Sequence, residues 1–442
     1  MRRRVTVAAA LIALVAGAGI SGVAAAGGGG GRGHEVWAVD QSNTNGTTSG
    51  GALYVYDGRE LEGRRAGEAK PERIDLGGAA RELCLAQTGS EPVRPHMLLF
   101  NAARSHAVLS FVASGHVLFL DARRRKPVAC LDAGVQAHAA VPAPDESFVI
   151  VANQNGKLVQ RIATDYATNT FRLEPEATLD LASGTTPSGA PRQDPALRPD
   201  NAPICPLVDS SSKLAFITLR GGGMFVLDPR SSPMRIVAEY DRETIHGNGC
   251  GGLESDGKMY VNSGGGTATN MAEFDVYAFE LDHFRSAAGG LICFPPAANT
   301  PAPKLVVSQD DREHSDSHGA TLTTHGRYLW VADRSGNRVV VISTRTDRMV
   351  GEFPLTGALS DDPSPDLLDT APGGDRVYVS LRGSLPLSGD PHASTGSTPG
   401  VGVIDVEAGG RRGKLRAIAR IANVDATGVD RADPHGLRVR MR

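Results

Sequence analysis

The sequence has few of the features that mark several common protein classes. Aromatic residues make up 5% of the 442 residues, and the formal net charge of −3 leaves no basic excess of the kind that binds nucleic acid. Beyond the first residues no apolar run is long enough to predict a membrane span. The motifs GxSxG, HExxH, the P-loop and a GxGxxG after a strand are all missing. The enzyme classes that these motifs identify are therefore excluded.

The first residues have the pattern of an export signal. Arginines at 2–4 precede a short apolar segment at 5–15, and three alanines at 24–26 offer a cleavage site. We expect a signal peptide at 1–26, a flexible Gly-rich leader at 27–34, and a secreted or periplasmic protein. The Sec route is favoured and the twin-arginine route stays open. The first cysteine is Cys84, so no lipoprotein anchor is expected.

Glycine is abundant, with 53 residues, and a strand pattern recurs along the chain. The clearest unit, RYLWVADRSGNRVVVISTRTDRMVGEFPLTG at 327–357, has three apolar runs separated by Gly/Asn and Thr/Asp turns, which predicts a three-strand meander. Six further stretches repeat it, at 35–58, 105–122, 147–163, 213–228, 258–282 and 375–406. Most of them follow a short strand such as PHMLLF, AHAAVP or HGATLT.

The unit at 327–357 resembles the YVTN repeat of bacterial surface and periplasmic β-propellers, the YncE-like superfamily. The resemblance is close in this unit and looser in the other six. It implies an all-β, seven-bladed β-propeller over residues 35–442. The superfamily also includes lactonase-like hydrolases, the propeller of nitrous oxide reductase and periplasmic zinc metallochaperones. The adjacent His-His pair of the reductase and the histidine-rich arm of the chaperones are missing here.

The first meander lacks a short strand in front of it, whereas the chain ends with PHGLRVRMR at 434–442. We therefore predict that this C-terminal strand joins blade 1 and closes the ring, which removes two open sheet edges. No helix of consequence is expected. Most long insertions fall at one end of the blades, which predicts the working face. They are at 41–51, 78–94, 182–202, 240–249, 263–273, 308–317 and 383–399.

Alignment of the blades places polar residues in register. The residue nine before the second strand opens the inner strand, and in four blades it is a metal-ligand type. The C-terminal strand has a histidine at the matching PHG position, so five consecutive blades of a closed ring would present such a residue. These candidate metal ligands are His318, Asp366, His435, His96 and His138. Imidazole and carboxylate suit Zn²⁺, Cu²⁺ or Fe²⁺, and three or four of these groups would hold one ion while the remaining one orients a ligand. The alternative is a water-filled polar channel mouth.

Weaker candidates lie nearby. Asp310, Asp311, His314 and Asp316 precede His318 in a loop that would carry a second carboxylate–histidine shell or simply face solvent. His246 would face the cavity, and His392 lies in a long loop that would act as a lid or be a surface excursion.

Five cysteines allow at most two intrachain disulfides and one free thiol. Cys205 and Cys250 each lie eight residues before a second strand, so they match on the inner strands of blades 4 and 5. We predict that these two form a disulfide, and thiolate ligation of a metal is the less favoured interpretation in an oxidising compartment. Cys84, Cys130 and Cys293 have no deducible pairing.

Three functions are consistent with these patterns. The first is a metal-binding propeller that carries or delivers Zn²⁺ or Cu²⁺, with no identified catalytic residue. The second is a metal-dependent enzyme at the same site, a copper oxidoreductase or a lactonase-like hydrolase. The third is a metal-free scaffold that binds a protein partner or a small-molecule ligand. A monomer is expected in each case.

Overall fold

The computed structural model describes residues 33–247, 249–264, 272–285, 290–291, 300–309, 314–387 and 395–442. The predicted signal peptide and nearly all of the leader lie outside these residues, as do Asp310, Asp311, Cys293 and His392. His34, which the leader was expected to include, is the first residue of strand β1. No helix among the described residues is long and apolar enough to cross a membrane.

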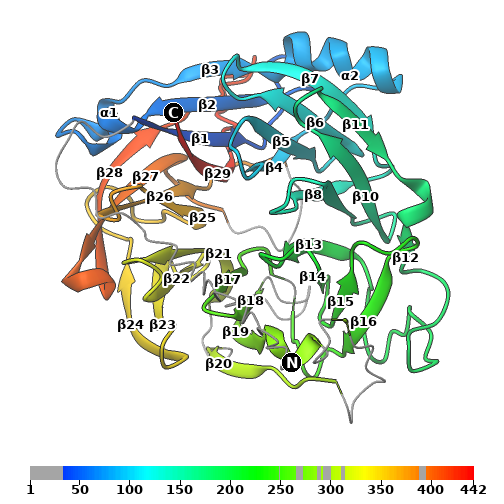
Figure 1. Ribbon diagram of the computed structural model, residues 1–442. Helices are drawn as coiled ribbons and strands as arrows, with labels where there is room; N and C mark the ends of the chain where they lie inside the picture. The colour runs from blue at the N-terminus through cyan, green and yellow to red at the C-terminus, as the bar shows by residue number, and fades with distance from the viewer. Residues whose placement is uncertain are drawn as a thin grey trace, which may run out of the picture. The chain divides into compact units, whose positions relative to one another are not determined.

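Antiparallel four-stranded sheets dominate residues 33–442, as the repeat pattern predicts (Figure 1). The second sheet in chain order has the strands β4 (Pro95–Phe100), β5 (His106–Phe111), β6 (His116–Asp121) and β7 (Lys126–Asp132). The third has β8 (Ala137–Pro142), β9 (Phe148–Asn153), β10 (Leu158–Asp165) and β11 (Thr170–Leu173), with β12 (Leu179–Asp180) pairing β10. The fourth has β13 (Pro203–Val208), β14 (Ala215–Leu219), β15 (Met224–Asp228) and β16 (Arg235–Tyr240).

Two further strand groups are joined into one sheet by a short parallel pairing of β19 with β21. The first group has β17 (Leu253–Ser255), β18 (Lys258–Gly264), β19 (Ala272–Glu280) and β20 (Lys304–Ser308). The second has β21 (Ser315–Thr323), β22 (Tyr328–Asp333), β23 (Arg338–Ser343) and β24 (Arg348–Pro354). A separate sheet follows with β25 (Pro365–Thr370), β26 (Arg376–Leu381), β27 (Gly400–Glu407) and β28 (Arg412–Arg420).

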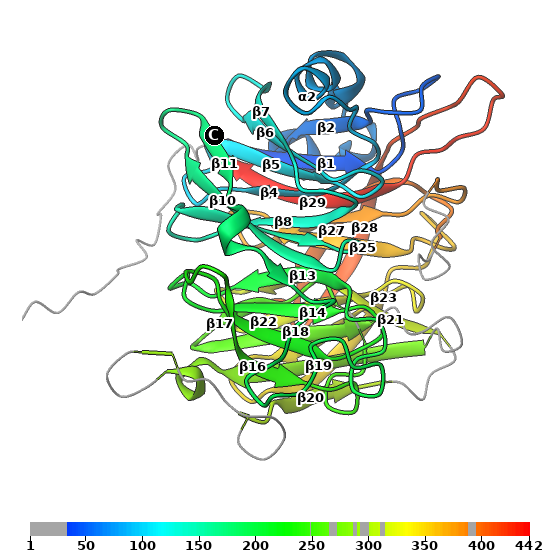
Figure 2. The same cartoon turned by 90° about the vertical axis from the view of Figure 1, so that its right-hand side faces the viewer.

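The remaining sheet combines strands from both extremes of the described chain. Its order is β29 (Pro434–Met441), β1 (His34–Asp40), β2 (Ala52–Asp57) and β3 (Glu72–Asp75). β29 runs antiparallel to β1 from the His34–Met441 pair to the Asp40–Pro434 pair, and Figure 2 shows the two strands side by side next to β4. The predicted pairing of the C-terminal strand with the first meander is therefore confirmed.

Neighbouring sheets pack face to face, and this explains why the inner and middle strands are apolar on both faces. Every residue of β22 and β23 is buried, whereas in β24 exposed residues alternate with partly buried ones and the buried Phe353. Trp330 of β22 packs with Leu368 of β25 and Val379 of β26 in one such layer. Burial on both faces requires continuous apolar runs, and the outer strand needs only alternation.

The expectation that no helix of consequence occurs is wrong for the segment 78–94. Helix α2 (Arg81–Thr88) lies there, capped by Gly89 in a left-handed conformation, and Cys84 on its buried face forms a disulfide with Cys130 of β7. Shorter helical turns are α1 (Gly58–Glu62), η1 (Ala66–Glu68), η2 (Leu76–Ala80), η3 (Pro175–Ala177), η4 (Leu281–Phe284) and η5 (Ala408–Gly410). The predicted insertion 308–317 is also too long, because β21 already begins at Ser315.

Candidate metal centre

The inner strands place the five predicted ligands at equivalent backbone irregularities. His96, His138, Asp366 and His435 are each the second residue of their strand, on β4, β8, β25 and β29, and His318 lies in β21. At each of these positions the register with the neighbouring strand shifts. A bulge breaks the alternation of side chains and re-aims one of them. The repeat thus turns one polar side chain per strand away from the sheet face.

Glycines allow the inner strands to approach one another at this level. A Cβ on Gly319 would clash with the backbone of Asp366, and a Cβ on Gly436 would lie 2.7 Å from the carbonyl oxygen of His96. Each glycine follows a candidate ligand directly in the sequence. In the His-Gly pairs at 318–319 and 435–436, the histidine is the candidate ligand and the glycine lets the next inner strand come close.

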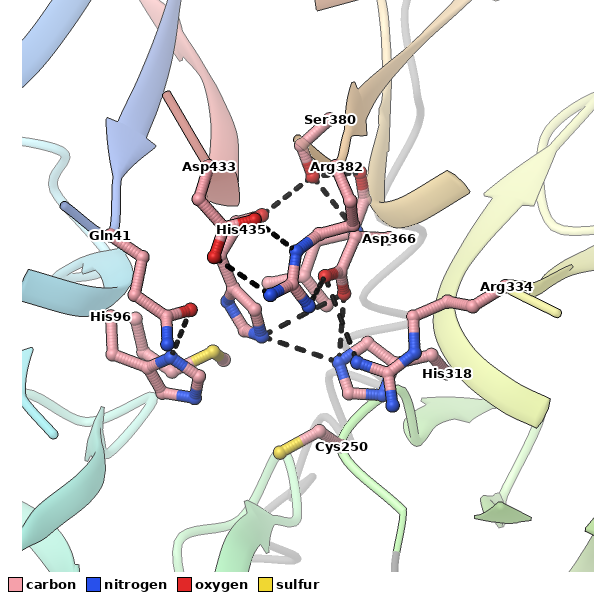
Figure 3. Close-up of polar contacts among 12 residues, drawn as sticks. Gln41, His96, Cys250, His318, Arg334, Asp366, Ser380, Arg382, Asp433 and His435 are labelled. Carbon is pink, nitrogen blue, oxygen red and sulfur yellow. Dashed lines mark hydrogen bonds and ion pairs between the residues drawn. The ribbon is translucent and has the colours of Figure 1, made fainter. Parts of the chain in front are cut away.

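His318, Asp366 and His435 form the tightest group (Figure 3). Nε2 of His318 lies 2.8 Å from Oδ1 of Asp366 and 3.4 Å from Nε2 of His435, and the His435 nitrogen lies 3.7 Å from the same Oδ1. Two ligands that each lie about 2.1 Å from one ion at a tetrahedral angle are about 3.4 Å apart. The three atoms therefore have nearly the spacing of one face of a tetrahedral site.

The other carboxylate oxygen of Asp366 is held by arginines. Oδ2 accepts a hydrogen bond from Nη1 of Arg382 at 3.0 Å and has Nη1 of Arg334 at 3.8 Å. Arg382 also donates to both oxygens of Asp433, at 2.6 and 2.8 Å, and Arg334 donates to Asp316 at 2.6 Å. Asp366 is thus fixed so that Oδ1 faces the two histidines. All of these charged groups are buried.

The charges of this cluster favour a bound cation. Three carboxylates (Asp316, Asp366 and Asp433) face two guanidinium groups, which leaves one negative charge when both histidines are neutral. Burial would by itself raise the pKa of Asp366, but the nearby His318, His435, Arg334 and Arg382 hold it well below its usual range. Burial lowers the pKa of His435 well below its usual value, with Asp366 acting in the opposite direction. The carboxylate is therefore ionised and the His435 imidazole neutral, as metal ligation requires.

His96 lies beside this group and makes a different set of contacts. Its ring centroid is 3.8 Å from that of His435, and its Nδ1 lies 3.1 Å from Oε1 of Gln41. Because the amide oxygen accepts, Nδ1 carries the proton and Nε2 keeps its lone pair. That Nε2 is buried with no hydrogen-bond partner among the described residues. Burial, followed by the neighbouring His435, lowers the pKa of His96 well below its usual value.

His138 lies farther along the same row of imidazoles. Its ring centroid is 4.5 Å from that of His96, and its Nδ1 donates to the carbonyl oxygen of Ile204 at 3.0 Å. Its close neighbours are the sulfur atoms of Cys205 and Cys250, which form the predicted disulfide. The structure thus gathers three of the five predicted ligands around one point and adds His96 and His138 as a row leading away from it.

The sequence pattern did not identify the residues that hold the ligands in place. Gln41, Arg334, Arg382 and Asp433 were all missed. One signal was available: WVADR and VYVSLR each end with an arginine directly after the second strand, at equivalent positions of two repeats. Of the weaker candidates, Asp316 pairs with Arg334, and His246 pairs with Asp275 at 2.6 Å in a separate group that includes Glu273.

Comparison with solved structures identifies the architecture. A protein from Lactobacillus plantarum aligns with a TM-score of 0.57 and 11% identity over 92% of this chain and 99% of that one. A putative 6-phosphogluconolactonase from Bacteroides fragilis aligns with a TM-score of 0.52 and 14% identity over 92% and 98% of the two chains. The fold is that of a β-propeller. No protein-family model and no curated protein sequence matches the chain.

Within this propeller, the candidate ligands come from inner strands of different sheets. β21, β25, β29, β4 and β8 follow one another in space, so one polar residue from each meets its neighbours. A propeller brings equivalent positions of successive blades together around its axis. The geometry of the cluster is therefore a property of the repeat.

Proposed function

We propose that the chain is a seven-bladed propeller, closed by β29, that binds one divalent transition metal ion and carries or delivers it outside the cytoplasm. His318, Asp366 and His435 would hold the ion, which is Zn²⁺ or Cu²⁺ by ligand type. The single observation that carries the proposal is the triangle of three ligand atoms separated by 2.8, 3.4 and 3.7 Å.

The strand groups support a count of seven blades. Five sheets stand alone, and the eight-stranded sheet divides at the parallel β19–β21 contact into two four-stranded groups. The pairing of β29 with β1 joins the last blade to the first, and β29 also contacts β25 and β4. Seven blades closed in this way place His318, Asp366 and His435 on three consecutive inner strands.

The surroundings of the site support metal binding. Nε2 of His96 and Oδ1 of Asp366 are buried without hydrogen-bond partners among the described residues, which costs free energy unless a ligand satisfies them. Oδ1 of Asp366 faces His318 and His435. Three protein ligands leave one position, which His96, water or a group of a partner protein would fill.

The ion pairs of the two arginines beside the site favour metal carriage over catalysis. Arg334 and Arg382 are each paired with buried carboxylates, so neither offers a free cation to a substrate anion. The alternative is a metal-dependent enzyme, a copper oxidoreductase or a lactonase-like hydrolase, at the same site. The likeness to the putative 6-phosphogluconolactonase favours the hydrolase form of that alternative.

Elemental analysis of protein purified from its own export compartment tests the proposal. We expect stoichiometric zinc or copper in the wild-type protein and loss of most of it in His318→Ala and His435→Ala. His34→Ala is the matched control, because His34 lies at the opposite end of the β1–β29 ladder from His435. Equal metal content in all variants, or none in the wild type, would contradict the site and leave a metal-free scaffold.

The same preparation separates the two metal-dependent functions. A carrier should release its ion to a competing chelator without any turnover, whereas a hydrolase should open lactones in a manner that His318→Ala abolishes. Copper with a visible absorption band would indicate redox chemistry.

A further inference from the structure

The two blades that lack both a histidine and the aspartate at the inner position carry a cysteine there. Cys205 is the third residue of β13, at the register shift between Pro203 and Pro206, and Cys250 lies just before β17. Cys205 and Cys250 are both buried. Every strand group thus contributes one side chain that can ligate a metal. In spatial order these are His435, His96, His138, Cys205, Cys250, His318 and Asp366.

We infer that reduction of the Cys205–Cys250 disulfide opens a second metal site, in which the two thiolates and His138 bind a soft ion such as Zn²⁺ or Cu⁺. The ligand set is distinct from His318, Asp366 and His435, so the inference does not depend on the first site being occupied. It extends the proposed function by adding a redox-controlled site at the other end of the imidazole row.

The geometry of the three residues supports this site. The sulfur atoms of Cys205 and Cys250 lie 3.9 and 4.0 Å from Nδ1 of His138, which donates to the carbonyl oxygen of Ile204 when no ion is bound. Ligation through Nδ1 replaces that hydrogen bond and moves the imidazole proton to Nε2, so the ring stays neutral. A sulfur and a nitrogen bound to one tetrahedral zinc ion are about 3.6 Å apart. The Cα atoms of the two cysteines are 5.2 Å apart, so rotation about the side-chain bonds is enough to separate the sulfurs to the roughly 3.8 Å of a zinc-bound pair.

The chemistry balances with a dithiol reductant. Two electrons and two protons pass from that dithiol to the disulfide, so the dithiol becomes a disulfide and Cys205 and Cys250 become thiols. Metal binding then displaces one proton from each thiol, because the thiolate is the ligand. Reoxidation re-forms the Cys205–Cys250 bond and removes both sulfur ligands at once. Occupancy of the site is therefore set by the reductant.

His138 connects the two sites. Its ring is 4.5 Å from that of His96, which in turn is 3.8 Å from that of His435 (Figure 3 shows His96 beside His435, with the Cys250 sulfur below the imidazoles of His96 and His318). A continuous row of nitrogen and sulfur ligands thus runs from the thiolate pair to the Asp366 site. An ion released by reoxidation has nitrogen ligands within reach at every step along this row.

Titration of the metal-free full-length protein with Co²⁺ tests the inference, because cobalt–thiolate bonding gives a charge-transfer absorption that nitrogen and oxygen ligands do not. We expect the oxidised protein to bind without this band, and the protein treated with a phosphine reductant to gain the band and one further equivalent of Co²⁺. After the same treatment, the double variant Cys205→Ser/Cys250→Ser should show neither the band nor the further equivalent of Co²⁺. It should still bind the Co²⁺ that the oxidised wild type binds.

Two further variants separate the outcomes. A triple variant with serine at Cys84, Cys130 and Cys293 controls for the other thiols and should keep the band. His318→Ala should lose the first equivalent and keep the band, so failure of the first site is distinct from failure of the second. Absence of the band in the reduced wild type, or its survival without Cys205 and Cys250, would overturn the inference.

If the Cys205→Ser/Cys250→Ser variant does not fold, His138→Ala provides the test. In the reduced state this variant must bind the band-forming equivalent of Co²⁺ more weakly than the wild type does, and unchanged affinity would overturn the inference.

Discussion

Individual charged residues near the candidate centre are held in unusual ionisation states by burial. Asp40, the last residue of β1, is fully buried and accepts hydrogen bonds from the backbone N–H groups of Ser42 and Asp433 and from the Asn423 amide. Burial raises its pKa to about 6, the hydrogen bonds oppose that rise, and the charge of Asp433 adds to it. Asp40 is therefore a carboxyl group whose proton is bound more tightly in the folded chain than in the unfolded one.

The pH dependence of stability should reveal this group. A raised pKa means that the folded state binds more protons than the unfolded state between about pH 4 and pH 6, so the contribution of Asp40 falls as pH rises through that window. Two pKa units correspond to about 3 kcal/mol. Asp40→Asn keeps an acceptor for the two N–H groups. In urea denaturation, the unfolding free energy of this variant minus that of the wild type should therefore increase by about 3 kcal/mol between pH 4 and pH 7. A difference that does not change with pH would contradict the assignment.

The sequence selected the candidate ligands but did not predict their arrangement. A fixed offset from the second strand selected His96, His138, His318 and Asp366 as candidates, and the PHG match added His435, because repetition makes position in the blade predictable. The offset carries no information on how far each bulge turns its side chain. For that reason it did not separate the three residues that share a point from His96 and His138. Nor did it identify Arg382, whose partners are Asp366 on β25 and Asp433 directly before β29.

At the scale of whole elements, strands were predictable and the helix was not. Each strand belongs to a repeated pattern, whereas α2 occurs once and spans eight residues, which is too short for a clear helical periodicity. The helix is held by tertiary contacts: Cys84 is joined to Cys130 of β7, and Thr88 lies 3.0 Å from Nε2 of His116 on β6. An isolated helix of this length is not stable in water, so packing and the disulfide supply its stability.

Removing that disulfide tests how much stability it provides. The bond links residues separated by 46 positions, and in the chain-entropy description a loop of that length stabilises the folded state by about 4 kcal/mol. The double variant Cys84→Ser/Cys130→Ser should lose roughly that amount in guanidinium denaturation. The control is Leu85→Ser, since Leu85 on the same helix is exposed and should change stability by less than about 0.5 kcal/mol. Equal stabilities for the two variants would show that the cross-link contributes little.

For the molecule as a whole, the proposed ion would connect parts of the chain that are far apart in sequence. His318, Asp366 and His435 belong to three different strand groups, so an ion held by them should bind the folded state and have no comparable site in the unfolded chain. Such linkage stabilises the folded state by about 4 kcal/mol when free metal is a thousandfold above the dissociation constant.

Calorimetry with and without metal measures this coupling. The unfolding temperature of the wild type should rise with added Zn²⁺ and fall when a chelator removes it. The unfolding temperature of His435→Ala should not respond to Zn²⁺ or to the chelator. That of His34→Ala should rise and fall with metal as it does in the wild type. A metal-induced rise that survives in His435→Ala would place the stabilising ion elsewhere, such as the group of His246, Glu273 and Asp275.

The pairing of β1 with β29 determines the order in which the molecule can be completed. β1 precedes all the other described strands in the chain and β29 follows them, so one hydrogen-bonding edge of β1 stays unpaired until the strands between them have been synthesised. An exposed edge of this kind readily pairs with other chains. His435 arrives on the same late strand, so a nascent chain lacks the full set of ligands. The ion site can therefore be assembled only after β29 has been synthesised.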